Sequence, residues 1–226
     1  KLYKINWVSG DVTQTVEFKF GEAVITYPPM KKAGYTASWD KEVPVVMPAE
    51  DLTFTAVYTP IQYYLRFNSA GGSAVENFYY DITSDRTLPT PERDGATFLG
   101  WKVSAGTGNW DKTTVYKGGT SLEGFYGNMT LTAVWQIKLH TVTWIAGDIT
   151  KVTQWYHGAT PSFDGTPYKS SDESRSYVFI GWDKEFPATV SESAIYVAEF
   201  AKVEELWHTV RFEASLGGSL SGTVVY

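Results

Sequence analysis

Cysteine is absent from the 226 residues of the chain. This absence excludes disulfides, zinc sites built on thiolates, thiol nucleophiles and internal thioester bonds. Clusters of lysine and arginine are also missing, and the net charge is −6 at pH 7. Binding to nucleic acid or to an anionic membrane requires a positive surface, so neither partner is expected.

Long hydrophobic runs are missing as well. No apolar stretch approaches the roughly 20 residues that span a bilayer, so we expect no membrane insertion in this segment. Residues 1–5 open within an alternating strand pattern rather than within a signal peptide. The chain is therefore expected to be a processed or excised piece of a protein.

Aromatic residues, in contrast, are abundant. They make up 16% of the chain, with 9 Trp, 15 Tyr and 12 Phe. Together with threonine and valine they favour half-buried strands over helices. The composition predicts a mainly β protein with little helix.

One pattern recurs along the chain. Four segments of alternating apolar residues are each followed by a glycine turn and a second alternating run, which is typical of a β-hairpin. They begin with YKINWVS at 3–9, YYLRFNS at 63–69, HTVTWIA at 140–146 and HTVRFEA at 208–214. In each complete unit a loop, a tryptophan-bearing strand, a second loop and a closing strand follow. The predicted order is therefore strand, strand, loop, strand, loop, strand.

The repeats predict a tandem array of small modules. Three complete modules are expected at 1–60, 61–137 and 138–202, and the first hairpin of an incomplete fourth at 203–226. Modules one and three share a GD turn and a WDKE motif, whereas two and four share a GGS turn, so two subtypes alternate. The linkers TPIQ, QIKL and AKVEEL are short and are not Gly/Ser-rich. This favours a semi-rigid array of neighbouring modules.

The tryptophan strands read GYTASW at 34–39, GATFLGW at 95–101 and SYVFIGW at 176–182. The second and third hold one residue more between their first small residue and the tryptophan. A β-bulge at Gly100 and at Gly181 would absorb it, because glycine tolerates positive φ. Side chains alternate between the faces of a strand, so Trp39, Trp101 and Trp182 would then all point into a core as its anchors.

Other tryptophans lie outside this repeated position. Trp7, Trp110, Trp144 and Trp155 are therefore the candidates for exposed aromatic side chains that stack against a sugar.

GATFLGW followed by GTGNWD, with MPAEDLTFTAVY and NMTLTAVW as closing strands, resembles the Listeria-Bacteroides repeat family, which includes the internalin B-repeat. The resemblance covers residues 2–200 and the front of a fourth module at 207–226. It implies small β-grasp-like modules in exported bacterial proteins, located outside the cell, at its surface or attached to its wall. It implies no catalysis.

The residue spacings typical of catalytic and metal-binding sites do not occur in the sequence. No HExxH, phosphate loop or Ser/His/Asp grouping can be assembled, so we expect no enzyme and no cofactor or metal. His140, His157 and His208 are interpreted as strand-edge residues. The acidic loop with Asp164, Asp172 and Glu173 is interpreted as solvated rather than as a calcium site.

Three functions remain open at this point. The first is a non-catalytic, semi-rigid stalk or adhesion module of a bacterial surface protein. The second is a carbohydrate- or glycoprotein-binding module that uses exposed aromatics. The third is a self-assembling filament subunit whose C-terminal hairpin, residues 207–226, pairs with another molecule. The partners would be a surface protein or glycan of a host or neighbouring cell, adjacent modules, or other copies of the chain.

Overall fold

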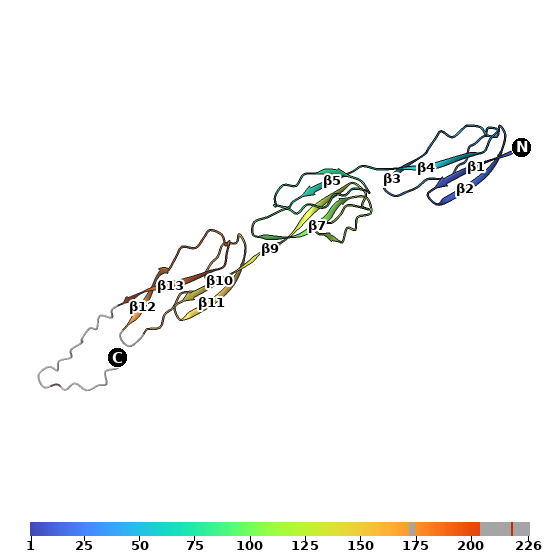
Figure 1. The fold of residues 1–226 in the computed structure, drawn as a ribbon. Helices are drawn as coiled ribbons and strands as arrows, with labels where there is room; N and C mark the ends of the chain where they lie inside the picture. Colours follow the sequence, from blue (N-terminus) through green and yellow to red (C-terminus); the bar gives the residue numbers. More distant parts are fainter. Residues whose placement is uncertain (172–174, 204–217, 219–226) are drawn as a thin grey trace. The chain divides into compact units, whose positions relative to one another are not determined.

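The computed structural model describes residues 1–171, 175–203 and 218 of the chain. All the regular secondary structure in this part is β-strand (Figure 1), which confirms the mainly β fold. The strands form three mixed sheets, two of four strands and one of five. The chain divides into two compact units, Lys1–Ile137 and Lys138–Tyr226. The fourth hairpin, including His208, lies outside the described residues except for Val203 and Gly218.

The first sheet has the order β2-β1-β4-β3. Its strands are β1 (Leu2–Ser9), β2 (Val12–Lys19), β3 (Tyr35–Trp39) and β4 (Leu52–Pro60). A tight turn with Gly10 at φ 59° joins β1 to β2 as an antiparallel hairpin. β1 then lies parallel to β4 at the centre of the sheet. This is the strand arrangement expected of a β-grasp-like module, with loops in place of a crossing helix.

The third sheet repeats this arrangement as β11-β10-β13-β12. Its strands are β10 (Leu139–Ala146), β11 (Ile149–Tyr156), β12 (Ser176–Trp182) and β13 (Ala194–Val203). The central parallel pair is again formed by the first and the last strand, and Trp144 faces Tyr196 as Trp7 faces Phe54 in the first sheet. The equal register allows residues of the two sheets to be compared position by position.

The second sheet has one strand more than the repeat pattern predicted. Its order is β6-β5-β9-β7-β8. The strands are β5 (Tyr63–Asn68), β6 (Phe78–Tyr80), β7 (Ala96–Gly106), β8 (Val115–Tyr116) and β9 (Met129–Ile137). The added β8 comes from the loop after the tryptophan strand and pairs with the outer side of β7. It is only two residues long, too short to leave an alternation in the sequence.

Each sheet packs one face against a core rich in aromatic rings. In the first, Trp7 stacks on Phe54 with ring centroids 4.9 Å apart, and Val24 and Met47 from the loops close the other side. In the third, Trp144 stacks on Tyr196 at 5.1 Å, with Val190 from a loop. Loops and rings therefore fill the space over the inner face.

The three predicted anchor tryptophans all pack against these cores, but to different depths. Trp101 is fully buried, whereas Trp39 and Trp182 are only half-buried. The difference follows from strand order. β3 and β12 are edge strands, so their indoles lie at the rim of the core. In the second sheet β8 covers the side of β7, and Trp101 lies opposite Tyr116.

Both predicted bulges are present. The register shifts between Phe98 and Gly100 in β7 and between Phe179 and Gly181 in β12. Gly100 has φ 144° and Gly181 has φ 158°, values that side-chain-bearing residues rarely adopt. Past the bulge the tryptophan returns to the face of the phenylalanine, with Phe98 and Trp101 ring centroids 5.4 Å apart. β3, which has no extra residue, keeps a regular register.

The two bulge glycines form a matched pair for a test of backbone strain. Gly181→Ala should cost about 1–2 kcal/mol through its positive φ alone, because an added Cβ would meet nothing within 4 Å. Gly100→Ala should cost the same strain plus about 1–3 kcal/mol for overpacking. The added Cβ would lie only 2.6 Å from the Tyr116 carbonyl oxygen. Urea unfolding of both variants measures the difference. Equal losses would contradict this account of the bulges.

Candidate interaction surfaces

The tryptophans predicted to be exposed for ligand stacking are mostly in the cores. Trp7, Trp110 and Trp144 are 2%, 4% and 0% exposed, so the prediction is wrong for these three. Trp7 and Trp144 lie on the central strands, where neighbouring strands flank them on both sides. Trp110 lies in a loop that folds onto the second core, and its indole N–H donates to the Tyr80 hydroxyl at 2.8 Å.

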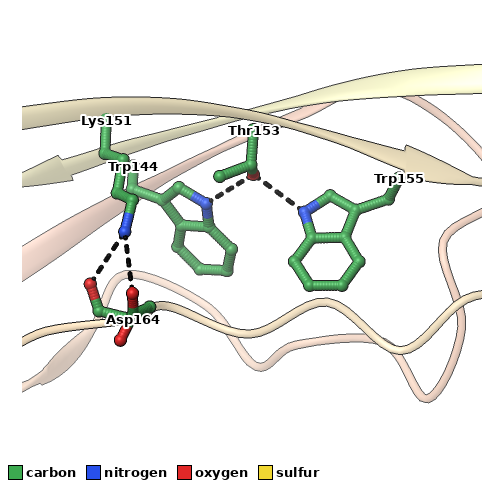
Figure 2. A network of polar contacts seen from close by, with 5 residues as sticks. All are labelled: Trp144, Lys151, Thr153, Trp155 and Asp164. Carbon is green, nitrogen blue, oxygen red and sulfur yellow. Dashed lines mark hydrogen bonds and ion pairs between the residues drawn. The ribbon is translucent and has the colours of Figure 1, made fainter.

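Trp155, the fourth candidate, is half-buried on the edge strand β11. Figure 2 shows its indole N–H pointing to the hydroxyl of Thr153, which also accepts the indole N–H of Trp144. The two N···O distances are 2.8 Å and 2.9 Å. Beside them the Lys151 ammonium contacts the carboxylate of Asp164 at 3.3 Å. The polar edge of Trp155 is thus engaged within the module.

The polar clusters of the loops serve the turns themselves. The backbone N–H and hydroxyl of Thr113 and the hydroxyl of Thr114 donate to Asp111. These bonds, led by the backbone N–H, lower the pKa of the Asp111 carboxyl to about 2. Asp148 accepts bonds from the hydroxyl and the backbone N–H of Ser170, which also lower its pKa. Asp111 thus holds its own turn by local bonds, whereas Asp148 links the β10–β11 turn to the loop that contains Ser170.

Two histidines that the sequence analysis treated separately lie together. The Nε2 of His140 lies 3.3 Å from the Nδ1 of His157, across the open end of the β10–β11 hairpin. Only the register could have shown this pairing. In the described part of the chain, no three His, Asp or Glu side chains gather in a way that could hold a metal ion. Asp172 and Glu173 of the acidic loop lie outside that part.

The larger surface pockets are open to solvent. One of about 500 Å³ lies beside Arg93, Phe98 and Trp135. Another of about 370 Å³ lies beside Phe186, Val190 and Tyr196. Both border the aromatic cores at the loop side of a sheet.

The outer faces of the sheets differ much more than their cores. On the first sheet Lys4 pairs with Glu17 at 3.9 Å, and the Thr15 hydroxyl donates to the side chain of Asn6. On the second, Arg66 lies over the ring of Tyr64. The outward positions of the third sheet carry mainly threonine, valine and isoleucine. We call these positions, together with the charged Glu199, the third outer face: Thr141, Thr143, Ile145, Thr150, Val152, Gln154, Val178, Ile180, Ile195, Val197 and Glu199.

The apolar members of the third outer face are well exposed. Val152 and Ile180 are each 62% exposed, Ile195 53% and Val178 50%. They form two groups, one where β11, β10 and the first half of β13 pair and one where β12 pairs with the second half of β13, and the charged Glu199 lies outward between them. Sequence alternation identified the strands, but not that this face, unlike the others, is apolar on all four of them.

No family of known proteins has a sequence profile that matches the chain. Two proteins of Evansella cellulosilytica are similar to it, and they carry the provisional names Gly-rich membrane protein and membrane protein. The first is 28% identical over 158 residues, 64% of this chain and 17% of the relative. The second is 27% identical over 198 residues, 80% of this chain and 28% of the relative. The chain thus spans less than a third of either relative.

Within the described part of the chain, no helix has the length and apolar character needed to cross a bilayer.

The Thr153 hydroxyl can be tested against its counterpart in the first sheet, Val16. Thr153→Val leaves two indole N–H groups without their acceptor and should lower the free energy of unfolding by about 1–3 kcal/mol. Val16→Thr should instead stabilise by up to about 1 kcal/mol, because the buried indole N–H of Trp7 has no hydrogen-bond partner among the described residues. Thermal and urea unfolding give both values. Losses of equal size would refute the proposed equivalence.

Asp111 should make stability depend on acid pH. Its pKa is lower in the folded chain than the ordinary 3.8, so the ionised carboxylate stabilises the fold above about pH 4. This contribution is lost as the pH falls from about 4 to about 2. Asp111→Asn should therefore lose less stability over that range than the unchanged chain, as measured by urea unfolding at several pH values. If the stability of the variant and of the unchanged chain fell equally over this pH range, Asp111 would not be the source of the dependence.

Proposed function

We propose that the chain is a non-catalytic repeat segment of a bacterial cell-surface or secreted protein, where it acts as a semi-rigid stalk or adhesion module. The observation that carries this proposal is the position of the first and last strand of each module. They are β1 with β4, β5 with β9, and β10 with β13, and each pair lies side by side and parallel.

A parallel pair of terminal strands resists being pulled lengthwise. Tension on the two ends of a module slides the strands past each other, so that all hydrogen bonds between them carry the force at once. If the strands were antiparallel neighbours joined at one end, the bonds would open one after another. This arrangement suits a segment that transmits force along its chain.

The aromatic cores reinforce the same strand pairs. Trp7 of β1 stacks on Phe54 of β4, and Trp144 of β10 stacks on Tyr196 of β13. Sliding of the strands would separate these stacked rings, so packing and hydrogen bonding resist the force together.

The connectors between modules are short. Only Ile61 and Gln62 separate β4 from β5, and only Lys138 separates β9 from β10. One or two residues leave little room for a flexible tether, which supports the semi-rigid character of the proposal.

The location rests on the similar proteins. Both are named as membrane proteins, which supports a place at the membrane or cell surface for this chain. The resemblance to the Listeria-Bacteroides repeats supports the finer proposal of an extracellular or wall-attached segment. A surface protein or glycan of a host or neighbouring cell would then be the partner of the whole protein.

The two alternatives have less support. A sugar-binding module would need exposed aromatics, and three of the four tryptophans considered for that role are buried. A filament built by the C-terminal hairpin depends on residues 207–226, which lie outside the described residues apart from Gly218.

Single-molecule force spectroscopy tests the stalk. Because the chain has no cysteine, new cysteines serve as unique handles. Handles at the two ends of module one, Lys1→Cys and Pro60→Cys, should load β1 and β4 in shear and require a high unfolding force. Handles at Lys1→Cys and Lys19→Cys should unzip the β1–β2 hairpin, since Leu2 lies opposite Lys19. We expect a force several-fold lower in the second geometry, and equal forces would contradict the proposed role.

A further inference from the structure

Two tyrosines lie directly opposite each other on the outer face of the second sheet. Tyr64 of β5 and Tyr79 of β6 are register partners, and their ring centroids are 4.7 Å apart with an interplanar angle of 48°. Leu65 and Tyr80, the next residues along the two strands, are buried in the core. Because side chains alternate between the faces of a strand, the outward rings lie on the opposite side. Tyr79 is 65% exposed, so the pair is open to small reagents in solution.

The short distance sets this pair apart from the other tyrosines. Among the remaining tyrosine pairs in ring contact in the described part of the chain, the closest is Tyr63 with Tyr80, at 6.1 Å. A direct carbon–carbon bond of about 1.5 Å between two rings places their centroids about 4.3 Å apart. The rings of Tyr64 and Tyr79 are therefore already close to the spacing of a covalently joined pair. Arg66 lies over the ring of Tyr64, 5.1 Å from its centroid, and helps to fix its position.

The matching positions of the other modules show that folding does not require two tyrosines here. In module one the strands carry Lys4 with Glu17 opposite it, an ion pair of 3.9 Å. In module three they carry Thr141 with Gln154 opposite it. The register of the parallel strands places the tyrosine pair of module two at the same two positions. The position thus joins the first two strands of a module through side chains whose chemistry varies.

β6 is held to its sheet by a short pairing. It has three residues, whereas the matching strands β2 and β11 have eight each. It also lies at the edge of the sheet, and the chain has no cysteine that could tie it by a disulfide. A bond between the two tyrosines would close a loop of about 15 residues, and such closure stabilises a fold by restricting the unfolded chain. A covalent tie at this position would therefore fasten a weakly held edge strand.

We propose that Tyr64 and Tyr79 are a site of oxidative crosslinking, at which a peroxide-driven one-electron oxidant such as a haem peroxidase joins the two rings as dityrosine. Each phenol loses one electron and one proton to give a phenoxyl radical. The two radicals couple through a carbon–carbon bond between the ring carbons next to the hydroxyl-bearing carbons, and the hydrogens on these carbons then move to the oxygens. One molecule of hydrogen peroxide takes up the two electrons and two protons and becomes two molecules of water. This inference does not depend on the stalk role.

Oxidation of the full chain by hydrogen peroxide and a haem peroxidase tests the site. At low protein concentration, coupling within one chain should exceed coupling between chains. We expect monomers that show the fluorescence of dityrosine and have lost the mass of two hydrogens. Trypsin cleaves after Lys41, Arg66 and Arg86, so the product should contain peptides 42–66 and 67–86 joined to each other. Mass spectrometry identifies this joined product.

Matched variants assign the bond to its residues. Tyr64→Phe and Tyr79→Phe each keep the ring but remove the hydroxyl that is oxidised, so each chain should lose the joined peptides. Tyr63→Phe removes the neighbouring hydroxyl, which lies on the same peptide, and should leave the yield unchanged. Circular dichroism verifies that the variants remain folded. Oxidation of the unchanged chain in urea should show no preference for this pair, because unfolding separates the two rings.

Three results would overturn the proposal. The first is a folded chain in which no coupling occurs within the monomer. The second is coupling of other tyrosine pairs in equal yield, since the closeness of the two rings would then not direct the bond. The third is an equal yield of the joined peptides from the Tyr64→Phe and Tyr63→Phe chains.

Discussion

The structure of each four-stranded module depends on two stacked rings across its central parallel strands. Trp7 on Phe54 and Trp144 on Tyr196 occupy the same register positions. A module of about 60 residues buries little surface and would be marginal without large side chains. The rings fill the volume that a helix would occupy over a larger sheet, and loop residues such as Val24 and Val190 close it. The high aromatic content of the chain follows from this constraint.

Because the inner face of a sheet carries the fold, the outer face can vary. Alternation places inward and outward side chains on the same strands, yet only the inward ones pack in the core. The first sheet carries Lys4 and Glu17 outward where the third carries threonine and glutamine, and several outward threonines of the first sheet are valine or isoleucine in the third. One scaffold thus offers surfaces of different chemistry while the parallel terminal strands stay the same.

The modules also reach similar cores by different means. Trp144 has Thr153 as hydrogen-bond acceptor, whereas the matching Val16 cannot serve Trp7. The second module has Phe67 at the position of these indoles and instead buries Trp101, whose N–H donates to the Pro89 carbonyl at 2.7 Å. The added β8 makes this possible, since it covers a strand that is an edge in the other two sheets.

The sequence alone determined the strands, their repetition and the bulges at Gly100 and Gly181, because these depend on local alternation and on single glycines. It did not determine which tryptophans are buried. That depends on whether a strand lies at the centre or the edge of its sheet, which long-range pairing decides. The same holds for β8, for the contact of His140 with His157 and for the apolar third outer face. Each arises from residues on different strands or loops, and only the tertiary structure brings them together.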